Sequence, residues 1–532
     1  MAELEFDEDK EFLLDGIING FELIPADSTL SPAEMDNYSS STKPEARDKV
    51  EQTLREEIAE GNYIITPTRP TIISALSAVP KAGSDELRLI HDCSMPVGKG
   101  VNSYVPSLDK LHFQTIDDAV KLVDKEFYLA KIDLRHAYRS VPIHPSNYAA
   151  TGLKWIFSGD TSPTFLYDTR LCFGERRAPG IFHRLTQSVK RMMFRRGFEG
   201  IVVYLDDFLI ISRSRAECEL AFTTLRELLL DLGFQISPSK VVPPCQQLTF
   251  LGIVFDTCAM ELSLPQNKLD ETKLLINTFL NRKRASQRQL QQLAGKLNWA
   301  CRVVHGGRTF LRRILDSMNS LRSASAKFRF TPEFRKDLFW WQSFLAVFNG
   351  KRIVHSKVPI ADVETDASQE AVGSYFRGDW AYSFLPADAP LVAPFHINVK
   401  EAFAIYLAAK RWGPQWANHH VIVHCDNQAA VAMINKGTTA NPIIMSWLRH
   451  LFWLSAIHNF RLTAVYVPGI DNIRADRISR MHTGVALIQL YSEFCKHIPS
   501  QVVSSELLVN HMSPTSAMFL CSRYCTGLQG AH

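Results

Sequence analysis

The 532-residue sequence has no long hydrophobic run. No apolar stretch reaches the roughly 18 residues that a membrane-spanning helix needs, so we predict no membrane segment. The first residues are acidic, whereas a secretory signal has a basic segment followed by an apolar one. We therefore expect an intracellular protein, in the cytoplasm, the nucleus or both.

Paired cysteine motifs are also missing. The ten cysteines are scattered, and no Cys-x-x-Cys pair is matched by a second such pair or by histidines. This pattern argues against a zinc site and indicates reduced thiols that are mostly buried.

The overall composition shows no extreme either. Hydrophobic residues make up 46% and charged residues 21%, as in ordinary globular proteins, and the length predicts three or four domains. The net charge of +4 is unevenly spread, because residues 1–60 hold 17 acidic and 5 basic residues, net −12, which leaves about +16 for the rest. A basic body is typical of proteins that bind a polyanion, although a charged surface is more often simply solvated.

Two adjacent carboxylates, Asp206 and Asp207, interrupt an apolar run at residues 201–211. The β-branched and aromatic residues on both sides predict a tight hairpin with the two acids at its tip. Burying carboxylates is costly unless a cation compensates them, so the pattern favours a divalent-metal site. A solvated turn is the alternative, because Asp is common in turns.

A third acid, Asp133, ends a predicted strand at residues 127–133. It could join the pair and give three acids for two metal ions, which stand about 3.5–4 Å apart in phosphoryl-transfer sites. Tyr138, five residues on, would then lie beside the sugar of a bound nucleotide. Lys81 and Arg88 lie on the two arms of a predicted hairpin, where they could bind phosphate or simply be solvated.

Cations gather on two predicted helical regions. One helix follows Ala178 and Pro179 and carries Arg184, Lys190, Arg191, Arg195 and Arg196. Residues 266–349 combine Arg and Lys with several tryptophans. Both regions suit a nucleic-acid backbone. Solvated basic helices and core tryptophans are the alternatives.

A β–α–β–α rhythm begins near residue 359 and predicts a separate α/β domain. Asp366 and Asp426 lie at the ends of predicted strands, Glu401 in the first turn of a predicted helix, and Asp476 on a short helix. Any one of them alone would be a surface or capping acid. Together the four acids could meet in one cleft and bind two metal ions.

At these motifs the sequence resembles a known family. Residues 63–255 are similar to the fingers and palm of a retroelement reverse transcriptase, and the Tyr-Leu-Asp-Asp box at 204–207 is the most specific signal. The resemblance implies that Asp133, Asp206 and Asp207 are catalytic, metal-binding acids. It also implies a nucleotide-binding set, which comprises Lys81 and Arg88 for the triphosphate, Tyr138 for the sugar, Phe173 and Gly174 for the dNTP and template, and Lys240 for the departing pyrophosphate.

Residues 359–482 resemble the RNase H domain that is tethered to such polymerases. The resemblance implies that the catalytic and metal-binding acids of this domain are Asp366, Glu401, Asp426 and Asp476. The loop Val467-Pro468-Gly469 lacks the histidine that retroviral RNases H place just before the last acid.

The resemblance implies a fold class of α+β and α/β multidomain type, a right-hand polymerase with fingers, palm and thumb followed by an RNase H-like α/β domain. We expect an acidic, largely flexible leader at 1–45, with some local order around Phe12–Leu23. Fingers and palm should follow at 46–265, a helical thumb or connection at 266–350, the RNase H-like domain at 359–482, and a tail at 483–532. Residues 88–92 with 100–103, residues 293–302 and residues 307–313 resemble tyrosine-recombinase (DIRS-like) retrotransposons, with gypsy-like elements next. The sequence has no Asp-Thr-Gly or Asp-Ser-Gly of an aspartic protease.

The implied function is an RNA-directed DNA polymerase with RNase H activity, which serves retrotransposon replication. The implied cofactor is Mg²⁺, two ions per active site, with Mn²⁺ as a substitute, and carboxylate oxygens suit these hard ions. The implied partners are an RNA template, a DNA primer, an RNA–DNA hybrid and dNTPs. Two alternatives stay open: a domesticated or inactive copy that only binds nucleic acid, and a DNA-copying polymerase with an appended nuclease.

Overall fold

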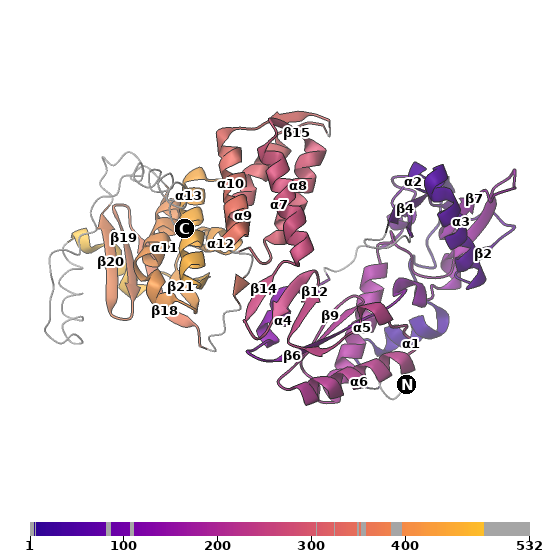
Figure 1. Cartoon of the computed structure of the whole chain (residues 1–532), viewed down its shortest axis with the longest axis horizontal. Helices are drawn as coiled ribbons and strands as arrows, with labels where there is room; N and C mark the ends of the chain where they lie inside the picture. The colour runs from indigo at the N-terminus through magenta and orange to yellow at the C-terminus, as the bar shows by residue number, and fades with distance from the viewer. Residues whose placement is uncertain are drawn as a thin grey trace. The chain divides into compact units, whose positions relative to one another are not determined.

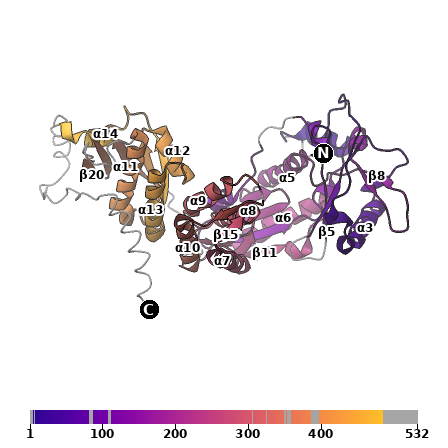
Figure 2. The same cartoon turned by 90° about the horizontal axis from the view of Figure 1, so that it is seen from above.

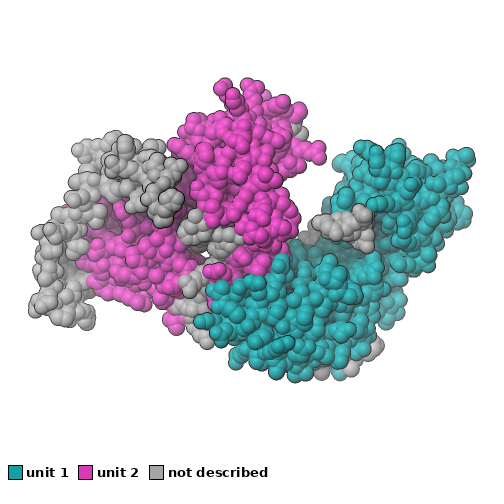
Figure 3. Space-filling model, viewed as in Figure 1, with its two compact units in different colours: residues 1–251, 255–259 teal, residues 252–254, 260–532 magenta. Residues whose placement is uncertain are grey.

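The computed structural model (Figures 1 and 2) describes residues 5, 7–80, 87–106, 111–304, 306–323, 325–347, 351–352, 358–384 and 396–483. Figure 3 colours its two compact units, which comprise residues 1–251 with 255–259, and residues 252–254 with 260–532. The predicted tail, apart from residue 483, lies outside the described residues. Within the described residues, no helix is long and apolar enough to cross a membrane.

The first unit contains a five-stranded sheet in the order β1-β3-β7-β8-β2, and a separate β4-β5 hairpin. The strands are β1 (Ala33–Glu34), β2 (Tyr63–Ile65), β3 (Ile72–Ile73), β4 (Leu76–Pro80), β5 (Leu87–His91), β7 (Gly152–Trp155) and β8 (Thr164–Asp168). Helix α3 (Pro44–Ala59) begins with proline in its first turn, where the missing N–H costs nothing. Its buried residues Val50 and Leu54 join a small core with Trp155 and Leu166 of the sheet.

A second sheet of the first unit has the order β11-β6-β10-β9. Its strands are β6 (Tyr128–Asp133), β9 (Ile201–Tyr204), β10 (Asp207–Ser212) and β11 (Val242–Cys245). Every residue from 201 to 212 is buried except the four at 204–207, so both faces of the hairpin are covered, which is why its sequence is a continuous apolar run. Helix α5 (Ala178–Arg195) packs on β9, and α6 (Arg215–Asp231) packs on β6, β10 and β11 (Figure 1).

The acidic leader is more ordered than predicted, since the sequence favoured a largely flexible segment with local order only around Phe12–Leu23. Helix α1 (Lys10–Asn19) is formed, and Leu13 and Phe21 are buried in the same core as the β9–β10 hairpin. Phe21 also pairs with Ile143 through a bridge and two backbone hydrogen bonds nearby. Local composition predicts disorder for an acidic segment, but partners more than 100 residues away supply the apolar surface and the cations that order it.

Shorter elements complete the first unit. They are α2 (Ser39–Thr42), α4 (Ile116–Leu122), and 3-10 turns at η2 (Val101–Ser103), η3 (Tyr138–Ser140), η4 (Pro145–Ala150) and η5 (Pro238–Lys240). Helix α4 begins at a capping box, in which Thr115 and Asp118 satisfy each other's backbone N–H groups. The sequence predicts this helix over 115–125, and it ends slightly earlier.

The second unit combines the predicted helical region with the predicted α/β domain. Its helices are α7 (Gln266–Leu280), α8 (Gln287–Ala300), α9 (Gly307–Asn319) and α10 (Pro332–Val347), with a small β15 (Arg284–Ser286) and β16 (Lys327–Arg329) pair. Strands β14 (Glu261–Ser263) and β17 (Lys351–Arg352) form an antiparallel pair in this unit. The residues of β12 (Gln247–Phe250) belong to the first unit, and those of β13 (Ile253–Asp256) are divided between the two units. Thr309 of α9 donates a hydrogen bond of 2.9 Å to the Gly437 carbonyl oxygen, which ties the helices to the α/β domain.

The α/β domain is built on a five-stranded sheet in the order β20-β19-β18-β21-β22. The strands are β18 (Ile360–Ala367), β19 (Ala371–Phe376), β20 (Asp379–Phe384), β21 (His420–Cys425) and β22 (Arg461–Tyr466), and the helices are α11 (Ile397–Trp412), α12 (Gln428–Lys436), α13 (Pro442–His458) and α14 (Ile473–Ser479). The central pairs β18–β21 and β21–β22 are parallel, and β19 and β20 are antiparallel additions.

Helices cover both faces of this sheet. Ser374 of β19 bonds to the Ala404 carbonyl oxygen of α11, and its neighbour Gly373 lies so close to α14 that an added Cβ would be 2.4 Å from Ser479 N. Because successive strand residues point to opposite faces, α11 and α14 lie on opposite faces. Helix α11 also packs against α12 and α13 (Figures 1 and 2).

Replacing Phe21 by alanine should cost about 3–5 kcal/mol of the free energy of unfolding, as expected for a buried phenylalanine in a packed core. The side chain is 2% exposed, whereas Ile18 of α1 is 71% exposed. Ile18→Ala is therefore the matched control and should change the free energy by no more than about 0.5 kcal/mol. Denaturant unfolding measures both, and equal small effects would show that the leader is not part of the core.

Candidate catalytic sites

The hairpin tip at residues 204–207 has the geometry that the sequence predicts. Strands β9 and β10 pair with Tyr204 opposite Asp207, so Leu205 and Asp206 form a two-residue turn. Leu205 has a φ of 52°, in the left-handed region that a branched side chain rarely adopts. Such a backbone persists only where the surrounding packing holds it, and here buried strands hold both ends of the turn.

The hairpin brings the three predicted acids together. Asp207 of β10 is the direct cross-strand partner of Asp133 at the end of β6. The Leu134 N–H donates to the Asp206 carbonyl oxygen at 3.0 Å, which fixes the turn against the end of β6. Asp133 is 4% exposed and the other two acids are partly buried. Three carboxyl groups therefore share one edge of the sheet.

Two lysines lie among these acids. Lys131 Nζ is 2.8 Å from Asp207 Oδ1, and Lys240 Nζ is 2.9 Å from Asp133 Oδ1. Burial raises the pKa of Asp207 to about 6, with Lys131 opposing the shift and the Asp133 carboxylate adding to it. Burial also raises the pKa of Asp206, and the Asp133 charge contributes in the same direction. The acids thus repel one another, and added positive charge would relieve that repulsion.

The predicted nucleotide-binding residues line up beside this edge. The Arg88 guanidinium lies 4.7 Å from the centroid of the Phe173 ring, and the Tyr138 ring lies 5.1 Å from the same ring. Burial raises the pKa of Tyr138 to about 12, and the nearby Asp206 carboxylate adds to the shift. Arg88, Phe173 and Tyr138 therefore form a continuous row that leads to the acids. Lys81 lies outside the described residues.

Gly174 is held by the end of β5. Its φ is +117°, and an added Cβ would meet the His91 carbonyl oxygen at 1.9 Å. The His91 N–H donates to the Phe173 carbonyl oxygen at 2.9 Å. Asn102 also holds the segment, because its amide donates to the Gly174 carbonyl oxygen at 2.9 Å and accepts from the Arg176 N–H at 2.8 Å. Glycine is therefore required here for close backbone approach.

A buried polar network lies behind residues 173–174. His91, Asp168 and Cys172 are close enough to supply an imidazole, a carboxylate and a thiol to one metal ion. Both Asp168 oxygens, however, already accept from Arg139 Nη1, at 2.8 and 2.7 Å. The hydrogen bond with Cys93, whose Sγ is 3.9 Å away, and burial raise the pKa of Cys172, so the thiol stays protonated. The network fixes the backbone rather than presenting a vacant ligand set.

The four predicted acids of the α/β domain also converge. Asp366 lies near the end of β18, Asp426 directly follows β21, and Asp476 is on α14. Glu401 lies in the second turn of α11 rather than in the first, because the helix begins at Ile397, earlier than predicted. Its Oε1 accepts from the Ala367 N–H at 3.1 Å, which places it beside the end of β18.

The charges of these four acids affect one another's pKa values, as expected for neighbouring carboxyl groups. Burial raises the pKa of Asp366 to about 6, and the charges of Asp426 and Asp476 raise it further while Ser479 and Arg480 oppose them. Burial raises the pKa of Glu401 well above its usual value, with Asp366 and Asp426 adding to the shift.

Neighbouring residues hold the α/β acids in place. Ser479 donates to Asp366 Oδ2, and Arg480 Nε donates to Asp476 Oδ1 at 2.7 Å. An added Cβ at Gly469, in the loop without histidine, would lie 3.1 Å from Asp426 Oδ2. The Cys425 thiol donates to Glu401 Oε2 at 3.6 Å, and burial keeps its pKa high, so it acts as a donor and not as a thiolate ligand.

Both clusters fit divalent ions of the hard type. Their donors are carboxylate oxygens, and burial, with neighbouring carboxylates adding to it, raises the pKa of Asp207 and of Asp366, so a bound cation would offset the cost of keeping these groups charged. Oxygen donors in this number suit Mg²⁺ or Mn²⁺. In the β11-β6-β10-β9 sheet the ligands would be Asp133, Asp206 and Asp207. In the α/β domain they would be Asp366, Glu401, Asp426 and Asp476.

The basic helix α5 is less available to nucleic acid than its sequence suggests. Arg191 Nη2 lies 2.6 Å from Asp7 Oδ1 and 2.9 Å from Asp9 Oδ2. Arg184 lies 2.5 Å from Asp9 and over the Phe12 ring. Two of the five arginines and lysines named for this helix are therefore bound to the leader, which the sequence pattern did not reveal.

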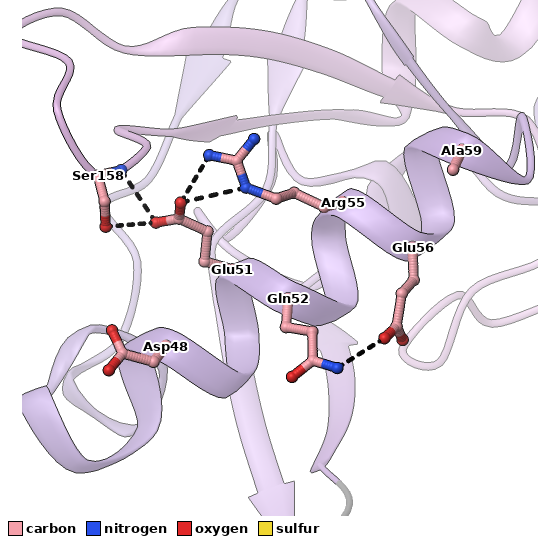
Figure 4. Close-up of a pocket in the computed structure, with 7 residues that line it drawn as sticks. All are labelled: Asp48, Glu51, Gln52, Arg55, Glu56, Ala59 and Ser158. Atoms are coloured by element: carbon pink, nitrogen blue, oxygen red, sulfur yellow. Dashed lines mark hydrogen bonds and ion pairs between the residues drawn. The ribbon is translucent and has the colours of Figure 1, made fainter.

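A depression on α3 carries none of the predicted residues. Figure 4 shows Glu51 between Arg55 and Ser158, with Gln52 bonded to Glu56. Glu51 Oε2 accepts from both the N–H and the hydroxyl of Ser158. These bonds tie α3 to the loop between β7 and β8.

Several site residues were missed by sequence reasoning. Lys131 precedes Asp133 by two residues and so faces the same side of β6, a period-2 signal that was available. Ser479 follows Asp476 by three residues on a helix, which is also a readable spacing. Asn102 and Cys425 contribute through contacts with residues far away in the sequence, which no local pattern indicates.

A known protein family matches the part of the chain that contains the first carboxylate cluster. Residues 79–255, which contain β5, the row of nucleotide-side residues and all three acids of the first cluster, match the family of reverse transcriptases (RNA-dependent DNA polymerases). The chain carries a reverse transcriptase domain of the retroelement and viral polyprotein type.

Relatives of the reverse transcriptase domain occur in viral polyproteins. The enzymatic polyprotein of Cassava vein mosaic virus is 21% identical over 84% of this chain and 66% of the relative. The Gag-Pol polyprotein of Avian reticuloendotheliosis virus is 24% identical over 48% of this chain and 22% of the relative. The chain thus spans about two thirds or less of the length of these relatives.

Solved structures share the fold beyond the reverse transcriptase domain. A foamy viral protease-reverse transcriptase in complex with double-stranded DNA aligns with a TM-score of 0.55 at 18% identity, over 84% of this chain and 73% of that one. A second, in complex with RNA/DNA hybrid, aligns with a TM-score of 0.54 at 17% identity, over 84% and 56%. The predicted fold class, a right-hand polymerase followed by an RNase H-like α/β domain, is confirmed.

Gly174→Ala should destabilise the reverse transcriptase domain by more than about 2 kcal/mol, because the new Cβ would overlap a backbone carbonyl oxygen that cannot move aside. Gly159→Ala is the matched control. Gly159 also has a positive φ, +96°, but nothing lies within 4 Å of its added Cβ. The control should therefore show backbone strain alone, about 1 kcal/mol. Equal losses in thermal unfolding would refute the close approach to His91.

Asp366→Asn should stabilise the metal-free protein at neutral pH. The folded-state pKa of Asp366, about 6, exceeds its ordinary value of 3.8. The folded state thus binds the proton more tightly, and its stability falls as pH rises from about 4 to 6. Removing the charge should recover about 3 kcal/mol at pH 7.5 and almost nothing near pH 3.5.

The control for this variant is Asp362→Asn, on the same strand but paired with Arg377 at the surface. It should change the midpoint of thermal unfolding little at either pH, because exposed ion pairs contribute little. Measurements in a chelator at both pH values decide the matter. A loss of stability in Asp366→Asn at pH 7.5 would contradict the assigned burial of a charged carboxylate.

Proposed function

We propose that the chain is an RNA-directed DNA polymerase that also degrades the RNA strand of RNA–DNA hybrids, both by two-metal phosphoryl transfer. The observation that carries the proposal is the presence of two separate carboxylate clusters, one at the β6–β10 edge and one at the β18–β21 edge. Each cluster has oxygen donors of the kind that bind Mg²⁺. We further assign the chain to the tyrosine-recombinase (DIRS-like) retrotransposons, on the sequence stretches that resemble them.

In the polymerase site, Asp133, Asp206 and Asp207 would hold two divalent ions. When bound, such ions lower the pKa of an attacking 3′-hydroxyl and neutralise charge on the transferring phosphates. The chain's own part is to hold the three carboxylates in place, through the β6–β10 register and the bond from Leu134 to the Asp206 carbonyl oxygen. Lys240 ends η5 with its side chain 59% exposed, and it would donate a proton to the departing pyrophosphate.

The incoming dNTP would lie along the row of Arg88, Phe173 and Tyr138. Arg88 offers a guanidinium to the triphosphate, and the sequence resemblance assigns Lys81 to the same task. Tyr138 is packed between Phe173 and Phe182, at ring distances of 5.1 and 5.6 Å. A ring fixed in this way has no room to yield to a 2′-hydroxyl, which favours deoxynucleotides.

In the second site, Asp366, Glu401, Asp426 and Asp476 would hold the ions that activate water against the RNA strand. Asp366 is oriented by Ser479, and Asp476 by Arg480. Related solved enzymes are in complex with double-stranded DNA and with RNA/DNA hybrid, which supports an RNA template, a DNA primer and their hybrid as partners. Binding should depend on salt, because the backbone is the main target. We propose that both reactions take place inside the cell, in the cytoplasm, the nucleus or both.

Asp206→Asn should reduce the rate of primer extension on an RNA template by at least about 100-fold, while cleavage of a labelled RNA strand continues. Asp426→Asn should do the reverse, because the two clusters belong to different sheets. Both reactions are read in one tube with Mg²⁺, dNTPs and an RNA–DNA hybrid.

The control for this experiment is Asp256→Asn, which alters a carboxylate that lies in neither cluster. It should leave both reactions unchanged. If the folded wild type binds the hybrid but performs neither reaction, the chain is an inactive binding copy and the proposal fails. Loss of both reactions in each single variant would refute two separate sites.

A further inference from the structure

Lys131 occupies a distinctive position in the polymerase site. It precedes Asp133 by two residues on β6, so both side chains face the same side of the sheet. Its cross-strand partner is Leu209, and the diagonal neighbour on that face is Asp207. The strand register therefore brings one ammonium group into the carboxylate cluster from within the sheet itself.

The contact of Lys131 with Asp207 is close and sheltered. Nζ lies 2.8 Å from Asp207 Oδ1, and the two side chains are only 14% and 19% exposed. Lys240 makes a similar contact with Asp133, at 2.9 Å, but its side chain is 59% exposed. Solvent therefore screens the Lys240 pair much more than the Lys131 pair. Lys240 reaches the cluster from an exposed position, whereas Lys131 is sheltered within it.

A divalent ion and Lys131 would compete for the same oxygen. A carboxylate oxygen that coordinates Mg²⁺ lies about 2.1 Å from the ion, so an ammonium group 2.8 Å from that oxygen would stand close to a double positive charge. The two cations repel each other strongly in a site with little water. For Asp207 to bind the ion through Oδ1, Lys131 must give up its ion pair.

We propose that Lys131 is a built-in counterion of Asp207 that competes with a divalent ion for this carboxylate and thereby sets the ion concentration at which the polymerase site fills. The inference rests on the proposed function of the three acids. In the absence of ions, Lys131 holds the β10 carboxylate close to β6 and offsets its repulsion by Asp133. When ions arrive, exchange of partners at Asp207 is the step that Lys131 resists.

The first test measures Mn²⁺ binding directly, without catalysis. The electron paramagnetic resonance signal of free Mn²⁺ gives the bound fraction in full-length protein that carries Asp366→Asn and Asp426→Asn, so that the second cluster does not contribute. In this background Lys131→Met should bind Mn²⁺ about three- to tenfold more tightly than the unsubstituted Lys131 protein, as expected when one sheltered competing charge is removed. Lys131→Arg keeps the charge and should bind Mn²⁺ as lysine does.

The matched control is Lys121→Met. Lys121 pairs with Asp118 at 2.9 Å on the surface, and its side chain is 73% exposed. Its loss should leave Mn²⁺ affinity unchanged. A further variant, Asp207→Asn, removes the disputed carboxylate, so adding Lys131→Met to it should produce no further gain in affinity. Circular dichroism establishes that each variant is folded, and Lys131→Gln replaces Lys131→Met if the latter does not fold.

Unchanged or weaker Mn²⁺ binding in folded Lys131→Met would overturn the proposal. Weaker binding would mean that the lysine orients Asp207 for the ion instead of competing with it. Primer extension by enzyme with an intact second site is measured separately, and its half-saturating Mg²⁺ concentration should fall by a similar factor. If Mn²⁺ affinity rises but no variant extends a primer, the inference stands and the proposed polymerase activity fails.

Discussion

Mutual repulsion among carboxylates is the constraint on which both sites of this chain depend. Three acids at the β6–β10 edge and four in the α/β domain are held within reach of one another, and burial raises the pKa of Asp207 and Asp366 to about 6. Each site needs a scaffold that withstands this repulsion before any ion arrives. In the polymerase site the scaffold is a hairpin buried on both faces, with Lys131 and Lys240 as counterions. In the α/β domain it is a set of hydrogen bonds from Ser479, Arg480 and the backbone at Ala367.

The nucleotide side of the proposed polymerase site depends on backbone more than on charge. Gly174 can approach the His91 carbonyl oxygen because it has no Cβ, and Asn102 bonds to the loop on both sides of Glu175. The ion pair of Arg139 with Asp168 lies in the buried network behind this loop. Phe173 therefore presents its ring to Arg88 and Tyr138 from a fixed backbone. Pre-organisation of this kind spares the site the entropy of ordering a loop when a nucleotide binds.

Sequence reasoning could predict the features that local patterns encode. The apolar run around Asp206 and Asp207 predicts the hairpin, and strand-end acids predict both clusters, because strand ends meet at one edge of a sheet. It could not predict that the leader packs against α5, since the cations that pair with Asp7 and Asp9 are more than 170 residues away on that helix. The predicted start of α11 was also wrong, because helix ends depend on capping. His396 caps the helix, which therefore begins at Ile397, and Glu401 lies in its second turn. Tertiary partners of this kind leave no trace in the nearby sequence.

The central claim is that two separate carboxylate clusters bind the divalent ions, and anomalous diffraction from a crystal grown with Mn²⁺ tests it most directly. The account predicts anomalous peaks beside Asp133 and Asp206 in the reverse transcriptase domain, and further peaks among Asp366, Glu401 and Asp426 in the RNase H-like domain. It also predicts that Lys131 Nζ lies farther than 2.8 Å from Asp207 Oδ1 once the first cluster is filled. Full occupancy of other carboxylates, with both clusters free of Mn²⁺ in a well-ordered crystal, would contradict the account.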